Sequence, residues 1–290
     1  PELSYRIVEA RERIGGTWDL FRYPGVRSDS DFFTLAFPFH PWRGENSIVD
    51  GDEILDYLDE VLTTYGIDKH ISYLTRVVGA DWSGGDARWT VKTVIDGGEQ
   101  QIRARFVIVC TGYYDYEQPY DAQIPGRERF TGQIIHPQFW PQDFEPDGKR
   151  IAVIGSGATA VTLVPSLVKL GARVTMVQRT PSFILAEPRK DPVAGLLRSK
   201  LAPARAHQIM RVKNTALQWG LYQACRRAPK TMRKLLRSGA ISGTGSETLV
   251  DTHFNPPYNP WDQRLCIAPG GDLFKALKDG GAQIVTGNIR

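Results

Sequence analysis

The sequence R-I-A-V-I-G-S-G-A-T-A-V at residues 150–161 decides the fold class of this 290-residue chain. Its apolar run, Ile151–Ile154, is typical of a buried parallel strand, and a helix is predicted over Val161–Leu170. The Gly-x-Gly-x-x-Ala turn between them permits a tight bend and a close approach of backbone to a pyrophosphate. The helix start adds free N–H groups and a positive dipole end. We therefore predict a dinucleotide-binding unit with contacts from Gly155, Ser156, Gly157, Ala158, Thr159, Ala160 and Val161.

The residues that end the next predicted strand, Arg173–Gln178, indicate which nicotinamide cofactor is bound. An NAD-binding unit places Asp or Glu there, whereas this chain has Gln178, Arg179 and Thr180. An acid would repel a 2′-phosphate, and a guanidinium binds one by paired hydrogen bonds. Arg179 and Thr180 therefore predict NADPH. The alternative, a glycine-rich crossover without a ligand, is disfavoured by the strand–turn–helix context and by the missing acid.

A second nucleotide-binding unit is indicated upstream. The predicted strand Tyr5–Glu9 ends on an acid that can accept hydrogen bonds from an adenosine ribose, and Phe106–Cys110 reads as a strand buried on both faces. Between them we predict a helix capped by Asp52 and ended by Gly66. A β-meander is predicted from three short β-prone runs, Ile71–Gly79, Trp89–Ile95 and Gln101–Arg105.

The connector F-T-G-Q-I-I-H-P-Q-F-W-P at residues 130–141 lies between these two units. Its glycine and prolines favour a shaped loop over a helix or strand. The pattern F-x-G-x-x-x-H-x-x-x-W-P is met by Phe130, Gly132, His136, Trp140 and Pro141, and it resembles the fingerprint of Baeyer–Villiger monooxygenases. Gln142 stands where that family often has Asp. The resemblance implies that His136 and Trp140 act as a hinge and a support for a moving NADPH domain rather than as reagents.

Further stretches resemble the same family of flavin monooxygenases and extend the likeness over nearly the whole chain. They are G-G-T-W-D at Gly15–Asp19, R-Y-P-G-V-R-S-D at Arg22–Asp29, and W-D-Q-R-L-C at Trp261–Cys266, which is most similar to the actinobacterial ethionamide-activating branch. The resemblance implies FAD contacts from Glu9, Gly15, Gly16, Thr17, Trp18, Asp19, Leu20, Arg27, Ser28, Asp29 and Val77.

The resemblance also implies an activity, in which FAD and NADPH serve the oxidation of a small ketone or thioether by molecular oxygen. Arg264 matches the active-site arginine of the ethionamide-activating branch, and a permanent cation there can hold negative charge on the reacting oxygen. Asp29 can orient it. N- or S-oxygenation is the nearest alternative, and a non-catalytic NADPH-binding protein is another. A flavin disulfide reductase would need two closely spaced cysteines, which the sequence lacks.

The predicted architecture is α/β, with two Rossmann-like dinucleotide-binding domains built as three layers around parallel sheets, a β-meander and a helical insertion. Residues 1–128 form the FAD-binding domain, residues 129–145 the fingerprint linker, and residues 146–290 the NADPH-binding domain. The insertion covers about residues 181–250, with a helix at Ala206–Arg227 and a mobile turn at Gly239–Gly245. A helix at Pro269–Gly280 and a strand at Ala282–Thr286 follow. Both chain ends look like interior cuts, so we expect a piece of a longer protein without the first strand of the FAD domain or its C-terminal return.

Charge and cysteine usage exclude other classes. The net charge of +4 is too small to indicate nucleic acid binding. Cys110, Cys225 and Cys266 have no metal or redox spacing, which predicts no metal site and fits a reducing cytoplasm, with each cysteine packed as a small residue. Residues 181–250 hold 13 Lys or Arg against 3 Asp or Glu, an excess of +10. This basic segment could cover a substrate pocket, contact acidic lipid at a membrane, or be an ordinary solvated face.

Overall fold

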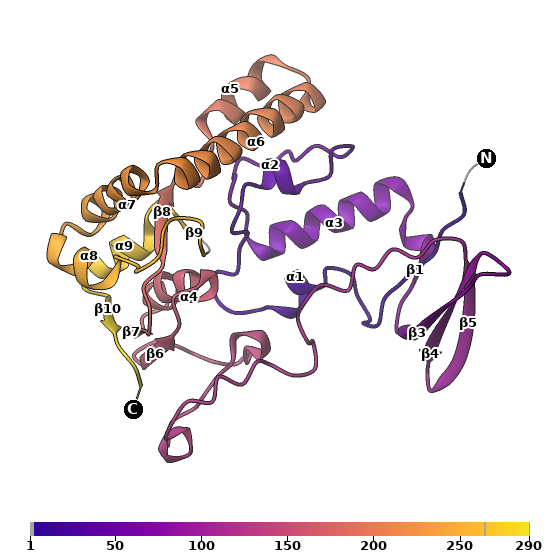
Figure 1. The fold of residues 1–290 in the computed structure, drawn as a ribbon, viewed down its shortest axis with the longest axis horizontal. Helices are drawn as coiled ribbons and strands as arrows, with labels where there is room; N and C mark the ends of the chain where they lie inside the picture. Colours follow the sequence, from indigo (N-terminus) through magenta and orange to yellow (C-terminus); the bar gives the residue numbers. More distant parts are fainter. Residues whose placement is uncertain (1–2, 264, 290) are drawn as a thin grey trace. The chain divides into compact units, whose positions relative to one another are not determined.

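The structure, a computed structural model, describes residues 3–263 and 265–289. The chain divides into two compact units (Figure 1). The first unit comprises Pro1–Leu20 and Asp52–Pro119, and the second comprises Phe21–Gly51 and Tyr120–Arg290. The predicted α/β class, with parallel sheets, is confirmed.

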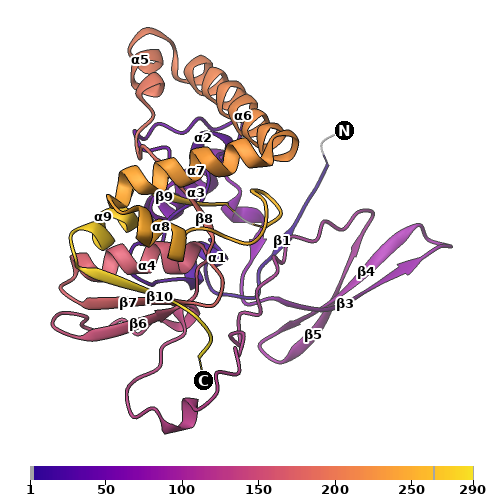
Figure 2. The same cartoon turned by 60° about the vertical axis from the view of Figure 1, so that its left-hand side comes forward.

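The centre of the second unit is a parallel sheet in the order β10 (Ala282–Thr286), β7 (Arg173–Gln178) and β6 (Arg150–Ile154). Helix α4 (Ala158–Lys169) packs on this sheet, and α9 (Asp272–Lys278) packs on α4 (Figure 2). The predicted strand–turn–helix–strand order is thus confirmed. The sheet and α4 bury a shared apolar core that includes Val161, Val164, Leu167, Val174 and Met176. Burying each such side chain contributes about 1.5–3 kcal/mol to folding.

The predicted helical insertion leaves and re-enters this unit along a pair of parallel strands, β8 (Phe183–Glu187) and β9 (Leu265–Pro269), which sequence reasoning missed. Between them lie the helices α5 (Pro192–Lys200), α6 (Pro203–Arg227), α7 (Pro229–Thr244) and α8 (Glu247–His253). The prediction of a helix at Ala206–Arg227 is confirmed.

The predicted mobile turn at Gly239–Gly245 is wrong, because residues 239–244 continue α7 and only Gly245, with φ of 73°, ends the helix. Leu236, Ala240 and Thr244 recur at a spacing of four residues and are buried. A Cβ on Gly243 would lie 2.7 Å from the Phe274 ring. This glycine therefore serves close packing of α7 on α9, not flexibility.

The N-terminal part of the second unit is the segment Phe21–Gly51. It contains one short helix, α2 (Phe32–Leu35), whose Phe32 and Phe33 side chains are buried. A bridge between Arg27 and Asp50 closes the segment on itself. The segment thus forms a closed loop within the second unit, with α2 near its middle.

The first unit contains α1 (Thr17–Leu20), α3 (Gly51–Tyr65, which begins at the last residue of the second unit) and a 3-10 helix, η1 (Asp68–His70). Its short strands β1 (Ile7–Val8) and β2 (Ile71–Ser72) pair in parallel. The predicted meander is confirmed by the antiparallel strands β3 (Arg76–Ser83), β4 (Arg88–Ile95) and β5 (Gly98–Ala104). Gly66 follows α3 with φ of 61°, as predicted, but Asp52 lies in the first turn of the helix rather than at its cap.

The predicted buried strand at Phe106–Cys110 is wrong. No strand forms over these residues, Phe106 and Ile108 are 78% and 86% exposed, and Cys110 is exposed rather than packed. A strand obtains its backbone hydrogen bonds from neighbours. No strand in the described part of the chain pairs with this run.

The remaining connection, from Tyr120 to Lys149, is largely irregular and holds two 3-10 helices, η2 (Arg127–Arg129) and η3 (Pro137–Phe139). Over residues 3–263 and 265–289, no helix combines the length and hydropathy needed to cross a bilayer.

Two glycines of α7 give a matched test of this packing. Gly243→Ala places a methyl group against Phe274 and should lower the free energy of unfolding by about 1–3 kcal/mol. Gly239→Ala, in the same helix with open space around its Cβ, should raise it by about 0.4–1 kcal/mol. Urea unfolding of both variants measures the difference. Equal effects would show that α7 is not in close contact with α9.

Candidate functional site

The glycine-rich turn between β6 and α4 leaves the start of the helix open. Gly155 has φ of 138°, a conformation that side chains rarely adopt, and its N–H donates to the Val177 carbonyl at 2.8 Å. Gly157 is the N-cap of α4, no side chain caps this helix end, and nothing lies within 4 Å of where its Cβ would be. The N-terminal N–H groups of α4 therefore border open space, which fits a pyrophosphate group.

Hydrogen bonds brace this turn against the strands beside it. The Ser156 hydroxyl donates to the Thr180 carbonyl at 2.9 Å, and the Ser182 hydroxyl lies 3.1 Å from that of Ser156. The Cys266 thiol lies 4.0 Å from the Ser156 carbonyl oxygen. Tyr258 donates to the Pro181 carbonyl at 3.0 Å, and burial raises the pKa of its hydroxyl. Ser182 and Tyr258 carry no motif, so sequence reasoning missed them.

The end of β7 combines a buried glutamine with an exposed arginine. Gln178 is buried, and its side-chain amide donates to the His253 carbonyl at 2.7 Å and to the Thr286 hydroxyl at 3.0 Å. Gln178 therefore has a structural role. Arg179 is exposed and forms no ion pair with the residues that the structure describes. The Arg179 guanidinium at the end of β7 could therefore bind a phosphate group.

The remaining turn residues belong to α4. Ala160 and Val161 are buried in the core of the second unit, and the Val161 N–H donates to the Gly157 carbonyl at 3.0 Å. Ala158 and Thr159 lie in the first turn of the helix. The side chain of Thr159 hydrogen-bonds that of Tyr23, a residue that sequence reasoning did not select.

Tyr23 joins the segment that carries Asp29 to the glycine-rich turn. Burial raises the pKa of the Tyr23 hydroxyl, the Asp29 carboxylate adds to the rise, and both the Thr159 hydrogen bond and the Arg27 charge oppose it. All four groups therefore act on one hydroxyl. Thr159 was predicted to bind NADPH, and Arg27 and Asp29 to bind FAD. Within the second unit, the structure therefore places Thr159, Arg27 and Asp29 around one side chain.

Close packing and a buried ion pair fix this segment. Gly25 has φ of 77°, and a Cβ there would lie 2.0 Å from the Ser166 hydroxyl of α4, so only glycine fits. Arg27 pairs with Asp272 of α9 at 2.6 Å, with side chains only 9% and 13% exposed. Ser28 is buried, and its hydroxyl accepts from the Val49 N–H at 3.0 Å. The side chains of Arg27 and Ser28 are thus engaged within the second unit.

In the first unit, the predicted FAD contacts gather around Arg11, which sequence reasoning missed. The Arg11 guanidinium pairs with the buried Asp19 at 2.7 Å and donates to the Gly16 carbonyl at 3.0 Å. Its backbone N–H donates to the Glu9 carboxylate at 2.9 Å. One arginine thus joins the strand-ending acid to the glycine pair.

The Gly15–Gly16 turn demands glycine, because Gly15 has φ of 106° and its Cβ would lie 2.4 Å from Leu55. Thr17, Trp18 and Leu20 belong to α1, directly after the turn. Val77 is half-exposed in β3, at an irregularity of the ladder with β4. Close packing therefore fixes the glycine turn, and Val77 lies at an exposed irregularity of the ladder.

The fingerprint residues hold the connector in shape. His136 caps η3, with its Nδ1 accepting the Gln138 N–H at 3.2 Å, and burial lowers the pKa of its ring. Trp140 packs on the core of the second unit and makes an edge contact with Phe144, with ring centroids 5.5 Å apart. Phe130 is exposed, and the space beside Gly132 is filled by the Phe130 ring. Pro141 follows Trp140 and precedes a turn.

Arg264 lies outside the described residues. The preceding chain makes a turn, with the Asp262 N–H donating to the Asn259 carbonyl at 3.0 Å, and Trp261 has φ of 69°. Among residues 3–263 and 265–289, no three His, Cys, Asp or Glu side chains cluster to hold a metal ion.

Comparison with known proteins gives consistent likenesses. The profile of the family described as "FMO-like: Flavin-binding monooxygenase-like" matches residues 33–210. The chain is 52% identical over 290 residues to the "FAD-containing monooxygenase EthA" of Mycolicibacterium smegmatis, covering all of this chain and 59% of the relative. It is 44% identical to the "Probable FAD-binding monooxygenase AlmA" of Acinetobacter baylyi, covering 58% of that protein. The chain thus spans a little over half the length of these relatives.

Among solved structures, the fold resembles that described as "Oxidized steroid monooxygenase bound to NADP". The TM-score is 0.77 at 20% identity, covering 97% of this chain and 60% of the other. A structure described as an "OTEMO complex with FAD and NADP" matches with a TM-score of 0.74, also at 20% identity, covering 96% of this chain and 60% of the other. At these identities the likeness concerns the fold.

His136 gives a pH-dependent test of the connector. Because burial lowers its pKa below the ordinary 6.5, the folded chain binds the proton less tightly than the unfolded chain does. Stability is therefore full above pH 6.5 and falls as the pH drops from there toward the lowered pKa. His136→Asn keeps an acceptor for the Gln138 N–H but does not titrate.

We expect thermal unfolding at about pH 8 to be similar in His136→Asn and in the unchanged chain. Between about pH 8 and pH 5 the unchanged chain should lose more of its melting temperature than the variant. Equal losses in the two proteins would show that the His136 ring does not titrate with folding.

Proposed function

Because the chain belongs to the flavin-binding monooxygenase-like family, we propose that it forms part of an FAD- and NADPH-dependent monooxygenase that inserts one oxygen atom next to a ketone carbonyl. The observation that carries this proposal is the contact of Tyr23 with Thr159. It ties the segment predicted to face the flavin to the turn predicted to bind NADPH. A hydride can pass between two cofactors only where both are held close together.

For NADPH, the proposed site consists of the turn at Gly155–Val161 together with Arg179 and Thr180. The open space in front of Gly157 and the uncapped start of α4 fit the pyrophosphate, and Arg179 fits the 2′-phosphate. Ser156 keeps the turn in place through the Thr180 carbonyl. No acid stands at the end of β7 to favour NADH.

For FAD, the proposed contacts are Glu9, the Gly15–Leu20 stretch, the Arg27–Asp29 stretch and the backbone near Val77. The Arg11 contacts give Glu9 and Gly16 a fixed geometry before any ligand binds. FAD, when bound, would take a hydride from NADPH and supply the redox chemistry with molecular oxygen. The residues of the chain would then bind and orient the two cofactors, exclude water from the site and stabilise negative charge on the reacting oxygen.

Charge stabilisation is assigned to Arg264, oriented by Asp29. A guanidinium keeps its proton at neutral pH, so it can hold negative charge on the reacting oxygen throughout the reaction. Asp29 lies two residues after Arg27, whose buried pairing with Asp272 fixes this stretch of backbone. A fixed backbone is what an orienting carboxylate needs.

Ketone oxidation is favoured over oxygenation of nitrogen or sulfur by the Trp140–Pro141 pair of the fingerprint. S-oxygenation of a thioether is kept as the second candidate activity, because the same bound cofactors would serve both reactions. We also retain the division into an FAD-binding part at 1–128, a linker at 129–145 and an NADPH-binding part at 146–290 as a proposal. The segment Phe21–Gly51, which lies in the first of these parts, belongs to the same compact unit as the proposed NADPH-binding part.

Arg179 should set the cofactor preference. In the full-length protein loaded with FAD, Arg179→Gln should raise the KM for NADPH by about 10- to 100-fold, since a charge-assisted hydrogen bond contributes about 1.5–3 kcal/mol. The KM for NADH should change little. Arg173→Gln, an exposed arginine at the other end of β7, is the matched control. A uniform change for both coenzymes would contradict the assignment.

Arg264 should separate oxygenation from NADPH oxidation. In the full-length loaded protein, Arg264→Met should lower product formation from a ketone by about 10²–10³-fold. NADPH should still be consumed, with hydrogen peroxide released instead of product. Products from a ketone and a thioether, measured side by side, decide between the two candidate activities. Unchanged coupling of NADPH to product in Arg264→Met would refute the proposed role.

A further inference from the structure

Helix α6 is buried at its two ends and exposed in its middle. Near its N-terminus, Ala206, His207, Met210 and Asn214 are buried, and near its C-terminus Cys225 is buried. Residues 215–220, between these regions, are all exposed. The helix has 25 residues, a length of about 37 Å at 1.5 Å per residue. We call Ala206–Asn214 the N-terminal anchor and Tyr222–Arg226 the C-terminal anchor.

The N-terminal anchor holds α2, which lies next to α6 (Figure 1). Its contact residues recur at the i, i+3, i+4, i+7 spacing of one helix face. The Arg211 guanidinium donates to the carbonyls of Phe33 at 3.1 Å, Thr34 at 2.9 Å and Ala36 at 2.6 Å. Phe33 packs against Met210. Arg211 therefore satisfies carbonyls that the C-terminal end of α2 leaves unpaired.

The same anchor reaches the N-terminal end of α2, through Asp31. The Asp31 carboxylate accepts from the N–H groups of Phe33 at 3.2 Å and Thr34 at 2.9 Å. Burial raises the pKa of this carboxyl, and hydrogen bonds oppose the rise, including one from the Asn214 side chain. Asp31 stands two residues after Asp29. The N-terminal anchor thus fixes the chain directly beside the proposed orienting carboxylate.

The C-terminal anchor holds the loop that leads to residue 264. Arg226 pairs with Asp262 at 2.6 Å. The Tyr222 ring makes an edge contact with Trp261, with centroids 5.7 Å apart, and the Trp261 side chain hydrogen-bonds Cys225. Trp261 has φ of 69°, a conformation that costs a non-glycine residue about 1–3 kcal/mol and persists only where its surroundings impose it.

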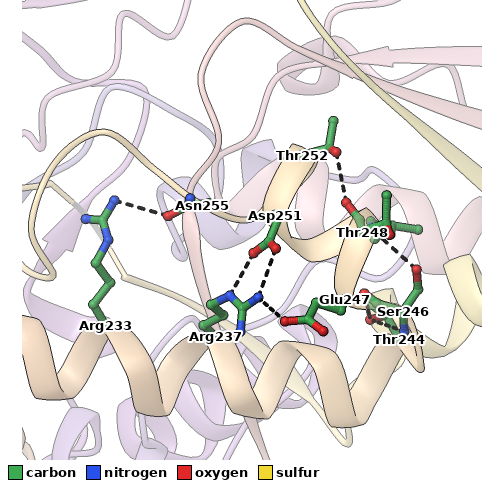
Figure 3. Close-up of polar contacts among 10 residues, drawn as sticks. Arg233, Arg237, Thr244, Ser246, Glu247, Thr248, Asp251, Thr252 and Asn255 are labelled. Carbon is green, nitrogen blue, oxygen red and sulfur yellow. Dashed lines mark hydrogen bonds and ion pairs between the residues drawn. The ribbon is translucent and has the colours of Figure 1, made fainter.

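Helix α7 holds the start of the same loop. Arg233 donates to the Asn255 side chain at 3.2 Å (Figure 3). It also donates to the Tyr258 carbonyl at 2.6 Å and to the Pro256 carbonyl. One turn further along α7, Arg237 pairs with Asp251 and with Glu247 of α8 (Figure 3). The loop from Asn255 to Gln263 is therefore held from α7 at its start and from α6 at its end.

We propose that α6 is a strut that sets the distance between the Asp29 segment and the loop leading to Arg264, with Arg226 and Trp261 as positioning residues. The inference rests on the proposed function, in which Asp29 and Arg264 act on one oxygen. A continuous helix that is fixed at both ends keeps the two segments bound to its ends at a constant distance. A displacement of about 1 Å at a reacting group can lower a rate by about 10²-fold.

The exposed middle of the strut can be altered without touching either anchor. Gly220 is exposed, and nothing lies within 4 Å of where its Cβ would be. Gly220→Pro removes a helical hydrogen bond and kinks the helix, whereas Gly220→Ala strengthens it. In the chain without cofactors, amide hydrogen exchange over residues 255–263 should rise about tenfold or more in Gly220→Pro. Exchange in α4 should stay unchanged, and Gly220→Ala should match the parent throughout.

A second pair of variants covers the case in which Gly220→Pro unfolds the unit. Arg226→Ala removes the ion pair with Asp262, whereas Arg227→Ala removes the next cation, which has no ion pair within the described ranges. Only Arg226→Ala should speed exchange over residues 255–263, and Arg226→Lys should restore part of the protection. If Arg226→Ala and Arg227→Ala give the same exchange, the strut is refuted.

The full-length protein loaded with FAD and NADPH then distinguishes this inference from the proposed function. Arg226→Ala should lower the yield of oxygenated product per NADPH about tenfold or more, with flavin reduction by NADPH unchanged. If Arg264→Met uncouples oxygenation but Arg226→Ala does not, the strut fails and the proposed function stands. If Arg264→Met leaves coupling intact, the proposed function fails, whatever the hydrogen exchange shows.

Discussion

The buried ion pair between Arg27 and Asp272 is the constraint on which the second unit depends. It links residues that lie 245 positions apart, with both side chains almost fully shielded from water. Removing one partner of such a pair leaves an uncompensated charge and typically costs about 3–5 kcal/mol. The pair fixes the segment Phe21–Gly51 to the first turn of α9, and α9 packs on α4. The segment that carries Asp29 is therefore attached to the same core as the glycine-rich turn.

Three further contacts complete that attachment, one by close packing and two by hydrogen bonds. Gly25 allows backbone to approach Ser166 of α4, Tyr23 hydrogen-bonds Thr159, and the Ser47 N–H donates to the Arg189 carbonyl at 2.8 Å. The last of these lies at the end of β8, where the helical insertion begins. One segment thus touches the glycine-rich turn, the core helix and the insertion. Chemistry that needs two cofactors near each other requires such a shared frame.

The sequence predicted those elements whose structure depends mainly on residues that are neighbours in the chain. The strand–turn–helix at residues 150–169 follows from apolar periodicity and glycine placement, and the helix predicted at Ala206–Arg227 follows from the prolines that punctuate the insertion. The prediction at Phe106–Cys110 failed because a strand depends on neighbours that its own residues do not reveal. The prediction at Gly239–Gly245 failed because glycine was taken as a turn signal where it permits helix contact with Phe274. Tyr23, Arg11 and Arg211 escaped selection because their partners are identified only by the fold.

The basic excess of the insertion also has a structural explanation. Several of its cations bind carboxylates and carbonyls within the second unit. Lys190 pairs with Glu45, Arg189 with Asp50, Lys213 with Asp191 and Arg226 with Asp262, and Arg211 and Arg198 donate to backbone carbonyls. Several of these partners lie in the segment Phe21–Gly51. Exposed ion pairs each contribute little energy to stability, so these contacts position the insertion more than they stabilise it. A segment rich in Lys and Arg is therefore what a helical insertion needs when its partners are acidic side chains and helix C-termini.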